Sequence, residues 1–395
     1  MNSRFFRTAL SGSVVALALA SGGAQAAKFH VLYAFLGNGI DGLDPQGNLF
    51  RDAAGDIYGA TAYGGASDKG AVFKVLPDGT EVILHDFADT PDGGLPRSGV
   101  LPDKAGNFYL TTSLGGRTGA GAVVKLAPDG TESVLYSFLG GNDGNQPVSN
   151  LIQDRQGNLY GTTLIGGDLD CLSVGCGTVF RLAPDGTETV LHAFSGADGY
   201  YPYAPVVMDK AGNLYGTAAN GGALGFGVLF KLAPDGTETT LHSFAGGSDG
   251  ANPTAGPVLD KAGNLYGTTS SGGGSDNCSG GCGAVFKLAS DGAETVLHSF
   301  GGSDGRYPDA NLTFGRDGNL YGTTAYGGRK DMGTVFKITP VGAFTRLHSF
   351  SGKDGQIPIT PLLMDKKGHL FGASYFGGDG YPDNFGEGVV FEIKP

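Results

Sequence analysis

One short phrase recurs seven times along this chain, and its recurrence is the strongest constraint on the fold. Successive copies are separated by 50 to 55 residues. Copies and near copies of GNLYGTT occupy residues 55–61, 106–112, 157–163, 212–218, 263–269, 318–324 and 368–374. A fixed period of this length, with turn residues in register, is typical of an architecture built from repeated supersecondary units.

The unit around the phrase contains further short apolar runs, which the third copy shows clearly. After the phrase come GTVFRL (177–182), the turn APDG, TETVLHAF (187–194) and, past a variable loop, PVVMD (205–209). Short runs bounded by Gly, Pro, Asp or Asn indicate β-strands rather than helices. Four strands in a unit of this length form one blade of a β-propeller, so we predict an all-β fold.

The two ends of the sequence predict that the repeats close into a ring. The chain ends on GVVFEIKP (388–395), which corresponds to the third strand of a unit, and the missing fourth-strand type occurs at the start as FHVLYAF (29–35). An open array would have no use for this permutation, whereas a ring closed in this way leaves no sheet edge exposed. We therefore predict a seven-bladed β-propeller of four-stranded repeats, closed by the N-terminal strand.

The beginning of the chain has the features of a secretory signal. Two arginines precede the short apolar run VVALALA (14–20), and the sequence AQA before residue 27 fits a cleavage site. We predict a signal peptide over 1–26, a single propeller domain over 27–395, and export to the periplasm or the cell exterior. No later run is long and apolar enough to span a membrane, and we expect a monomer.

Charge and cysteine content narrow the partners and the chemistry. The formal net charge of −12 argues against nucleic acid, because phosphate contacts need clustered Lys and Arg. An exported chain usually pairs its cysteines, and these lie as two close pairs in long loops of non-neighbouring units. We predict the local disulfides Cys171–Cys176 and Cys278–Cys282. A redox site, or a zinc site with its four convergent ligands, is the alternative.

The combination of motifs resembles a known family. The phrase itself, GTVFKI (333–338), PDGTETVLHAF (184–194) and DGYYP (198–202) look like the motifs of the Gloeo/Verruco (GloVer) tandem-repeat proteins. The resemblance covers essentially all of 29–395. It implies an exported repeat protein, and the family carries no agreed activity.

The loops divide the predicted propeller into a constant and a variable face. With the strands of a blade named A to D from the axis outward, the A–B and C–D turns are short and nearly identical in every unit. The B–C and D–A loops lie on the opposite face and vary in length and chemistry. Variable loops on a rigid scaffold are where function is preferentially found, so we expect any site on that face.

Two positions on the variable face differ between units while their neighbours repeat. The first follows the proline of each D–A loop and should stand at the mouth of the central channel. It is occupied by Gln46, Arg97, Val148, Tyr203, Thr254, Asp309 and Ile359. The second precedes a Gly-Gly pair and is occupied by Tyr63, Leu114, Ile165, Asn220, Ser271, Tyr326 and Phe376. Drift at exposed positions would produce the same variation.

Ring closure makes neighbours of the last two blades and the first. We therefore expect Tyr326, Phe376 and Tyr63 to form an aromatic cluster on the variable face, with Asp309 and Gln46 beside it. Aromatic rings with nearby carboxylate and amide groups suit a sugar, whose faces are apolar and whose edges carry hydroxyls. The predicted ligand-binding residues are Tyr63, Tyr326, Phe376, Gln46, Arg97, Tyr203 and Asp309.

The repeated histidines and aspartates are interpreted as structural. Five histidines share one place in the fourth strand, namely His85, His192, His242, His298 and His348. None stands alone on the variable face, so a Ser-His-Asp site is not expected. An Asp-Gly pair recurs in every D–A loop, at Asp41, Asp92, Asp143, Asp198, Asp249, Asp304 and Asp354. A turn closed by glycine explains it, and calcium binding is the alternative. We otherwise predict no metal and no cofactor.

Three functions remain open. The first is a binding module for carbohydrate or a cell-surface polymer. The second is a polysaccharide lyase or hydrolase on the variable face, which would need Arg97, Tyr203 and Asp309 to converge. The third is a scaffold for protein contacts or adhesion. We favour binding over catalysis.

Overall fold

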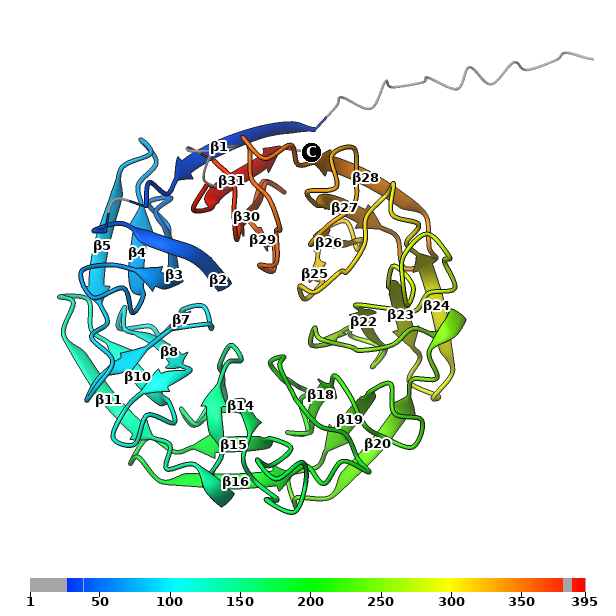
Figure 1. Cartoon of the computed structure of the whole chain (residues 1–395), viewed down its shortest axis with the longest axis horizontal. Coiled ribbons are helices and arrows are strands. Elements are labelled where there is room, and N and C mark those ends of the chain that lie inside the picture. Colours follow the sequence, from blue (N-terminus) through cyan, green and yellow to red (C-terminus); the bar gives the residue numbers. More distant parts are fainter. Residues whose placement is uncertain (1–26, 38, 379–385, 395) are drawn as a thin grey trace, which may run out of the picture.

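The computed structural model describes residues 27–37, 39–378 and 386–394, and the predicted signal peptide over 1–26 lies outside them. Seven antiparallel sheets stand around a central axis (Figure 1). The predicted all-β propeller of seven four-stranded blades is thus confirmed. Within the described ranges, no helix has the length and hydrophobicity that a membrane crossing needs.

Each blade orders its strands A to D from the axis outward. Blade 1 contains β2 (Gly42–Arg51), β3 (Ile57–Gly64), β4 (Ala71–Val75) and β5 (Glu81–Asp86). Blade 2 contains β7 (Leu101–Pro102), β8 (Phe108–Thr112), β10 (Ala122–Leu126) and β11 (Glu132–Ser137). Blade 3 contains β13 (Ile152–Gln153), β14 (Leu159–Ile165), β15 (Thr178–Leu182) and β16 (Glu188–Ala193). Blade 4 contains β17 (Val207–Met208), β18 (Leu214–Ala218), β19 (Val228–Leu232) and β20 (Glu238–Ser243).

The remaining blades follow the same order. Blade 5 contains β21 (Val258–Leu259), β22 (Leu265–Thr269), β23 (Ala284–Leu288) and β24 (Glu294–Ser299). Blade 6 contains β25 (Thr313–Phe314), β26 (Leu320–Thr324), β27 (Thr334–Ile338) and β28 (Phe344–Ser349). Blade 7 contains β29 (Leu363–Met364), β30 (Leu370–Ser374), β31 (Val389–Lys394) and β1 (Lys28–Ala34). The loops add β6 (Gly93–Gly94), β9 (Leu114–Gly115), β12 (Asn145–Pro147) and the 3₁₀ turns η1 (Gly141–Asp143) and η2 (Gly247–Asp249).

The ring closes through the N-terminal strand, as predicted. Strand β1 pairs antiparallel with β31, from Lys28 opposite Lys394 to Ala34 opposite Val389. Figure 1 shows β1 as the outer strand of the last blade, beside the C-terminal β31. Phe35, just after β1, is fully buried. The closing strand therefore adds core as well as hydrogen bonds.

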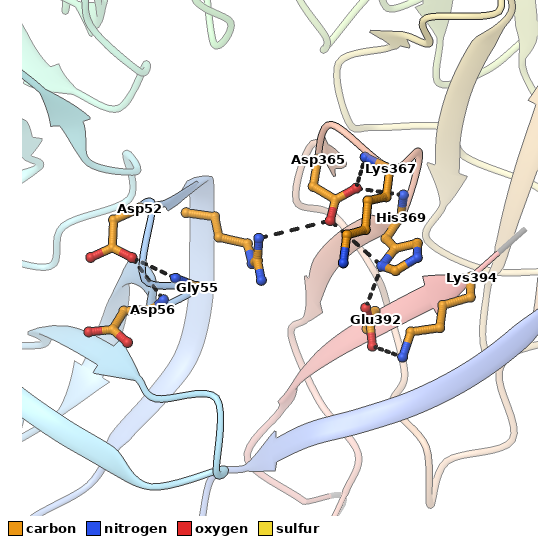
Figure 2. A network of polar contacts seen from close by, with 9 residues as sticks. Asp52, Gly55, Asp56, Asp365, Lys367, His369, Glu392 and Lys394 are labelled. Carbon is orange, nitrogen blue, oxygen red and sulfur yellow. Dashed lines mark hydrogen bonds and ion pairs between the residues drawn. The ribbon is translucent and has the colours of Figure 1, made fainter.

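Polar contacts join blades 7 and 1 at the A–B turns (Figure 2). Arg51 Nη1 lies 3.9 Å from an Asp365 carboxylate oxygen, and the Arg51 guanidinium lies 5.0 Å from the centre of the Phe371 ring. Within blade 7, Glu392 accepts contacts from His369 Nδ1 and Lys394 Nζ, both at 3.0 Å. The seam where the chain's two ends meet thus has charged contacts in addition to strand pairing.

The recurring phrase is the B strand of each blade, and its residues serve the fold. In blade 3, a Cβ on Gly161 would lie 2.8 Å from the buried Phe180 ring, so only glycine lets the C-strand phenylalanine pack there. The Tyr160 hydroxyl donates to Asp154 in the A–B turn at 3.0 Å. The Asn158 side chain donates to the same carboxylate at 2.7 Å. The phrase repeats because six blades place this glycine against a C-strand phenylalanine, whereas blade 2 has Leu110 opposite Val124.

Candidate functional site

The repeated aspartates hold the D–A loops that carry the candidate residues. Asp198 accepts a hydrogen bond from the Ser195 backbone N–H at 2.8 Å, and its other oxygen lies 2.9 Å from His192 Nε2. Equivalent pairs are His242–Asp249, His298–Asp304, His348–Asp354, Tyr33–Asp41 and Tyr136–Asp143. Four of the five repeated histidines are thus partners of these carboxylates, while His85 Nε2 lies 4.0 Å from a Glu132 carboxylate oxygen instead. In the part of the chain that the structure describes, no group of His, Cys, Asp and Glu is arranged to hold a metal ion.

The residue before each D–A proline has a left-handed backbone. This conformation costs a non-glycine residue about 1–2 kcal/mol, yet none of the seven is glycine. Positive φ values of 52° to 60° occur at Asp44, Leu95, Gln146, Tyr201, Asn252, Tyr307 and Ile357. Strain of this kind persists only where the surroundings over-determine it, and it clusters at functional sites.

Contacts to the preceding blade hold each strained residue in place. The Tyr201 N–H donates to the Cys176 carbonyl of blade 3 at 3.0 Å, and the Tyr201 carbonyl accepts from the Ala219 N–H at 3.1 Å. The next residue, Pro202, packs against Gly177, where a Cβ would lie 2.5 Å from the proline ring. Each D–A loop is therefore fixed to its neighbour, and the residue after the proline starts from a rigid support.

The seven residues that follow these prolines, here called the post-proline ring, surround one cavity. This mouth cavity has a volume of about 520 Å³, and all seven residues line it. A smaller cavity of about 110 Å³ shares the same ring and is also lined by Asn150 and Asn311. The expectation that these positions meet at the channel mouth therefore agrees with the geometry, while their role in binding stays a prediction.

The mouth cavity combines one cation, one carboxyl group and a tyrosine. Arg97 is exposed, and the Tyr203 side chain is 42% exposed. Burial raises the pKa of Asp309 to about 6, and the Thr254 hydroxyl, which donates to its carboxylate at 2.9 Å, opposes the shift. Burial also raises the pKa of Tyr203, against the opposing charge of Arg97. Arg97, Tyr203 and Asp309 thus line one cavity, and their convergence on one reacting group stays a prediction.

A second polar cluster lies on the rim between blades 7 and 1. Burial raises the pKa of Asp44 to about 6, and the adjacent Tyr375 hydroxyl opposes that shift. The pKa of Tyr375 is raised to about 12 by burial and by Asp44, with a smaller effect from Tyr63, while Arg97 lowers it. Tyr375 therefore lies within electrostatic reach of both Tyr63 and Arg97.

Two of the three aromatic residues expected to cluster have ring contacts within their own blades. Tyr326 packs edge-to-face on Tyr307, with ring centres 6.0 Å apart, and the Arg306 guanidinium lies 4.8 Å from its centre. Phe376 packs on Tyr375 with ring centres 4.5 Å apart. Tyr326, Phe376 and Tyr63 are half-buried and do not line the mouth cavity. The predicted site residues therefore divide into four in the mouth cavity and three outside it.

Both predicted disulfides are present, Cys171–Cys176 in blade 3 and Cys278–Cys282 in blade 5. The second cysteine of each pair is fully buried. The carbonyl of that cysteine accepts the inter-blade hydrogen bond from the strained residue of the next D–A loop. Each disulfide therefore fixes a B–C loop, and this loop holds the D–A loop of the next blade, which carries a residue of the post-proline ring.

Sequence reasoning missed two features. Leu95 and Gln146, from the strained set, also line the mouth cavity, and variation just before the same prolines could have pointed to them. A second cavity, of about 1140 Å³, lies on the other face among the A–B turns of blades 2, 3 and 4. Its aspartates, such as Asp154 and Asp209, belong to turns that repeat around the ring, so the pattern of variation carries no signal for it.

The fold and the variable mouth define a class of protein, the seven-bladed β-propellers with a cavity at one end of the channel. The particular family is also shown: the chain belongs to the Gloeobacter/Verrucomicrobia repeat family, whose sequence model matches residues 8–203, 83–280 and 247–395. A comparison with curated proteins finds no match.

Solved structures show the same architecture at low sequence identity. A streptogramin B lyase structure has a TM-score of 0.61 and 13% identity, covering 93% of this chain and 97% of that chain. The extracellular domain of a candidate one-component system from B. thetaiotaomicron has a TM-score of 0.56 and 15% identity, covering 93% of this chain and 42% of that chain. At this identity the likeness shows the fold alone.

Proposed function

We propose that this chain is an exported binding module for carbohydrate or a cell-surface polymer, with the mouth cavity as its ligand site. One observation carries the proposal. The post-proline ring differs in every blade, on loops whose flanking residues repeat, and all seven of its members line one cavity. Drift at exposed positions would give the variation alone, and the meeting of all seven variable residues at one cavity supports a ligand site. The two disulfides support export, because disulfides persist in oxidising compartments.

The chemistry of the cavity suits a saccharide. Leu95 and Val148 offer apolar surface on blades 2 and 3, and Gln46, Thr254 and Asp309 offer hydrogen-bonding groups on blades 1, 5 and 6. Sugars present apolar faces and hydroxyl edges, so both kinds of surface have a partner. An exposed ring such as Tyr203 contributes a contact on the order of 1 kcal/mol, by analogy with aromatic pairs.

A glycan screen of the mature chain, run with and without a chelator, tests the proposal. Tyr203→Ala should weaken binding about fivefold at an unchanged melting temperature. Phe226→Ala is the matched control, because both residues belong to blade 4 and are 42% and 44% exposed, and only Tyr203 lines the mouth cavity. Binding that is unchanged in Tyr203→Ala and weakened in Phe226→Ala would overturn the assignment of the site.

The aromatic residues outside the cavity are tested separately, by changing Tyr63, Tyr326 and Phe376 one at a time to alanine. Loss of binding at unchanged stability would add them to the site. A large fall in stability at all three positions, with binding intact, would show that they are packing residues.

Catalysis on an acidic polysaccharide is the second candidate, favoured by the presence of Arg97, Tyr203 and Asp309 in one cavity. A carboxyl group with a pKa of about 6 is close to the range that general acid–base catalysis needs. Turnover that is abolished by Tyr203→Phe, a change that removes one hydroxyl, would promote this candidate over simple binding.

A further inference from the structure

Arg97 is the one basic residue among the residues that line the mouth cavity. Two other arginines form ion pairs, Arg51 with Asp365 and Arg306 with Asp331. Among residues 27–37, 39–378 and 386–394, no ion pair or hydrogen bond involves the Arg97 side chain. The cavity thus contains an exposed guanidinium whose charge no carboxylate neutralises.

The fold does not require a cation at this place. The equivalent residues of the other blades are uncharged or acidic, namely Gln46, Val148, Tyr203, Thr254, Asp309 and Ile359. Other arginines without an ion pair occur on the surface of the described chain, such as Arg117 and Arg316, but only Arg97 lines the mouth cavity. The repeat therefore gives no structural reason for a cation at this place.

The backbone around Arg97 is held firmly, so its side chain starts from a fixed point. Pro96 packs against Gly70 of blade 1, where a Cβ would lie 2.6 Å from the proline ring. On the other side, Ser98 Oγ donates to the Thr111 carbonyl at 3.2 Å and accepts from the Thr111 N–H at 2.8 Å. A group positioned in this way loses little freedom when it binds a ligand.

The groups around Arg97 complete a site for an acidic sugar. The hydroxyls of Tyr203 and Tyr375 lie within its electrostatic reach, and tyrosine hydroxyls donate to ring and carboxylate oxygens. The carboxyl group of Asp309 accepts a hydrogen bond from the Thr254 hydroxyl at 2.9 Å, and it can also accept from a hydroxyl of the sugar. A guanidinium binds a carboxylate through two parallel hydrogen bonds, and Leu95 and Val148 offer apolar surface to the sugar ring.

We propose that Arg97 binds the carboxylate of a uronic acid, so that the ligand of the mouth cavity is an acidic rather than a neutral polysaccharide. This inference rests on the proposed saccharide-binding function and specifies its ligand class. It makes Arg97 the residue that determines specificity, with Tyr203 beside it.

Calorimetric titration of the mature chain with matched probes tests the proposal. The probes are trigalacturonate and trimannuronate, each beside its methyl ester, which keeps the sugar and removes the charge. The unmodified chain should bind at least one acid about tenfold tighter than its ester, because a charge-assisted pair is about twice as strong as a neutral one. Arg97→Gln should abolish this preference. Arg117→Gln, an exposed arginine of the same blade outside the mouth cavity, should leave it intact.

Four other results would each overturn the proposal. Equal affinity for acid and ester, or a preference that survives Arg97→Gln, would remove Arg97 from the site while leaving saccharide binding in place. Inorganic phosphate that binds as tightly as the acidic trisaccharides, with the same dependence on Arg97, would indicate a general anion site. Failure of every acidic and neutral glycan to bind would overturn the proposed function as well.

Discussion

The A–B turns and the post-proline ring lie at opposite ends of the same inner strands. The turns repeat from blade to blade, whereas the residues of the post-proline ring vary. Around the ring, most A–B turns use one aspartate to satisfy the backbone and a B-strand tyrosine, as Asp154 and Tyr160 do in blade 3. The post-proline ring has no repeated partner, and its side chains face a cavity. The comparison shows that hydrogen-bond satisfaction makes one end of the propeller uniform, while an open cavity leaves the other end free to acquire specificity.

The largest expected effect comes from removing the strand that closes the ring, on which both ends of the propeller depend. A chain that starts at Leu36 lacks β1 and the buried Phe35. We expect it to lose about 5 kcal/mol or more of unfolding free energy, since deleting one buried phenylalanine side chain alone costs about 3–5 kcal/mol and an unpaired edge is exposed. Thermal melting beside the chain that starts at Ala27 measures this. Equal melting temperatures would contradict the closure of the ring by β1.

The next largest effect separates the two ends directly. Asp209 accepts hydrogen bonds from the Ala211 and Asn213 N–H groups at 2.8 and 2.9 Å and from the Tyr215 hydroxyl at 3.1 Å. Asp209→Ala should lower the free energy of unfolding by about 2–3 kcal/mol and leave glycan binding unchanged, whereas Tyr203→Ala should do the reverse. Asp209 also lines the larger cavity on the turn face. Loss of binding at unchanged stability in Asp209→Ala would therefore move the ligand site to that face.

A smaller effect is the dependence of stability on pH, which comes from glutamates that lie between the two ends of the propeller. Burial raises the pKa of Glu132, Glu188 and Glu294 to about 7, and nearby D–A loop aspartates add to the shift. The folded chain therefore binds protons that the unfolded chain, with an ordinary pKa of 4.5, does not bind. Stability should rise as the pH falls from about 8 to about 5. Below about pH 4 it should fall, because Asp198, Asp304 and Asp354 have lowered pKa values.

Melting temperatures at several pH values measure this dependence, and Glu188→Gln is the control. The neutral glutamine should raise the melting temperature at pH 8, have little effect at pH 5, and flatten the slope between them. A melting temperature that rises steadily from pH 5 to pH 8 in the unmodified chain would show that these glutamates do not control stability.

The smallest expected effect concerns the strained residues before the prolines. Gln146 has a φ of 56° and lines the mouth cavity. Gln146→Gly relieves about 1 kcal/mol of backbone strain in the folded chain. Glycine also raises the conformational entropy of the unfolded chain, which costs a similar free energy. The melting temperature should therefore hardly change, while glycan binding weakens because a side chain of the cavity is lost. A loss of several kcal/mol with intact binding would instead place Gln146 with the packing residues.

The amino-acid sequence by itself determined the architecture. Its period, its turn residues and the displaced fourth-strand type predicted seven blades and closure by the N-terminal strand, and both are observed. The alignment of the repeats also predicted the disulfide pairs. It places Cys171 and Cys278 in equivalent loops of blades that are not neighbours, so each cysteine pairs within its own loop. These features could be predicted because they depend on contacts within one repeat, and the repeat is written seven times.

Only the tertiary structure decided which variable residues meet. The post-proline ring was expected at the mouth, and the structure brings all seven members to one cavity. Of the aromatic residues expected as a cluster, Tyr326 packs on Tyr307 of its own blade, while Tyr63 acts electrostatically on Tyr375 of the neighbouring blade. Their clustering stays a prediction. The left-handed backbone of Gln146 and the cavity among the A–B turns had no counterpart in the predictions. The physical reason is that the packing between blades, such as Pro202 on Gly177, orients each loop, and one blade's sequence does not specify the partner on which it packs.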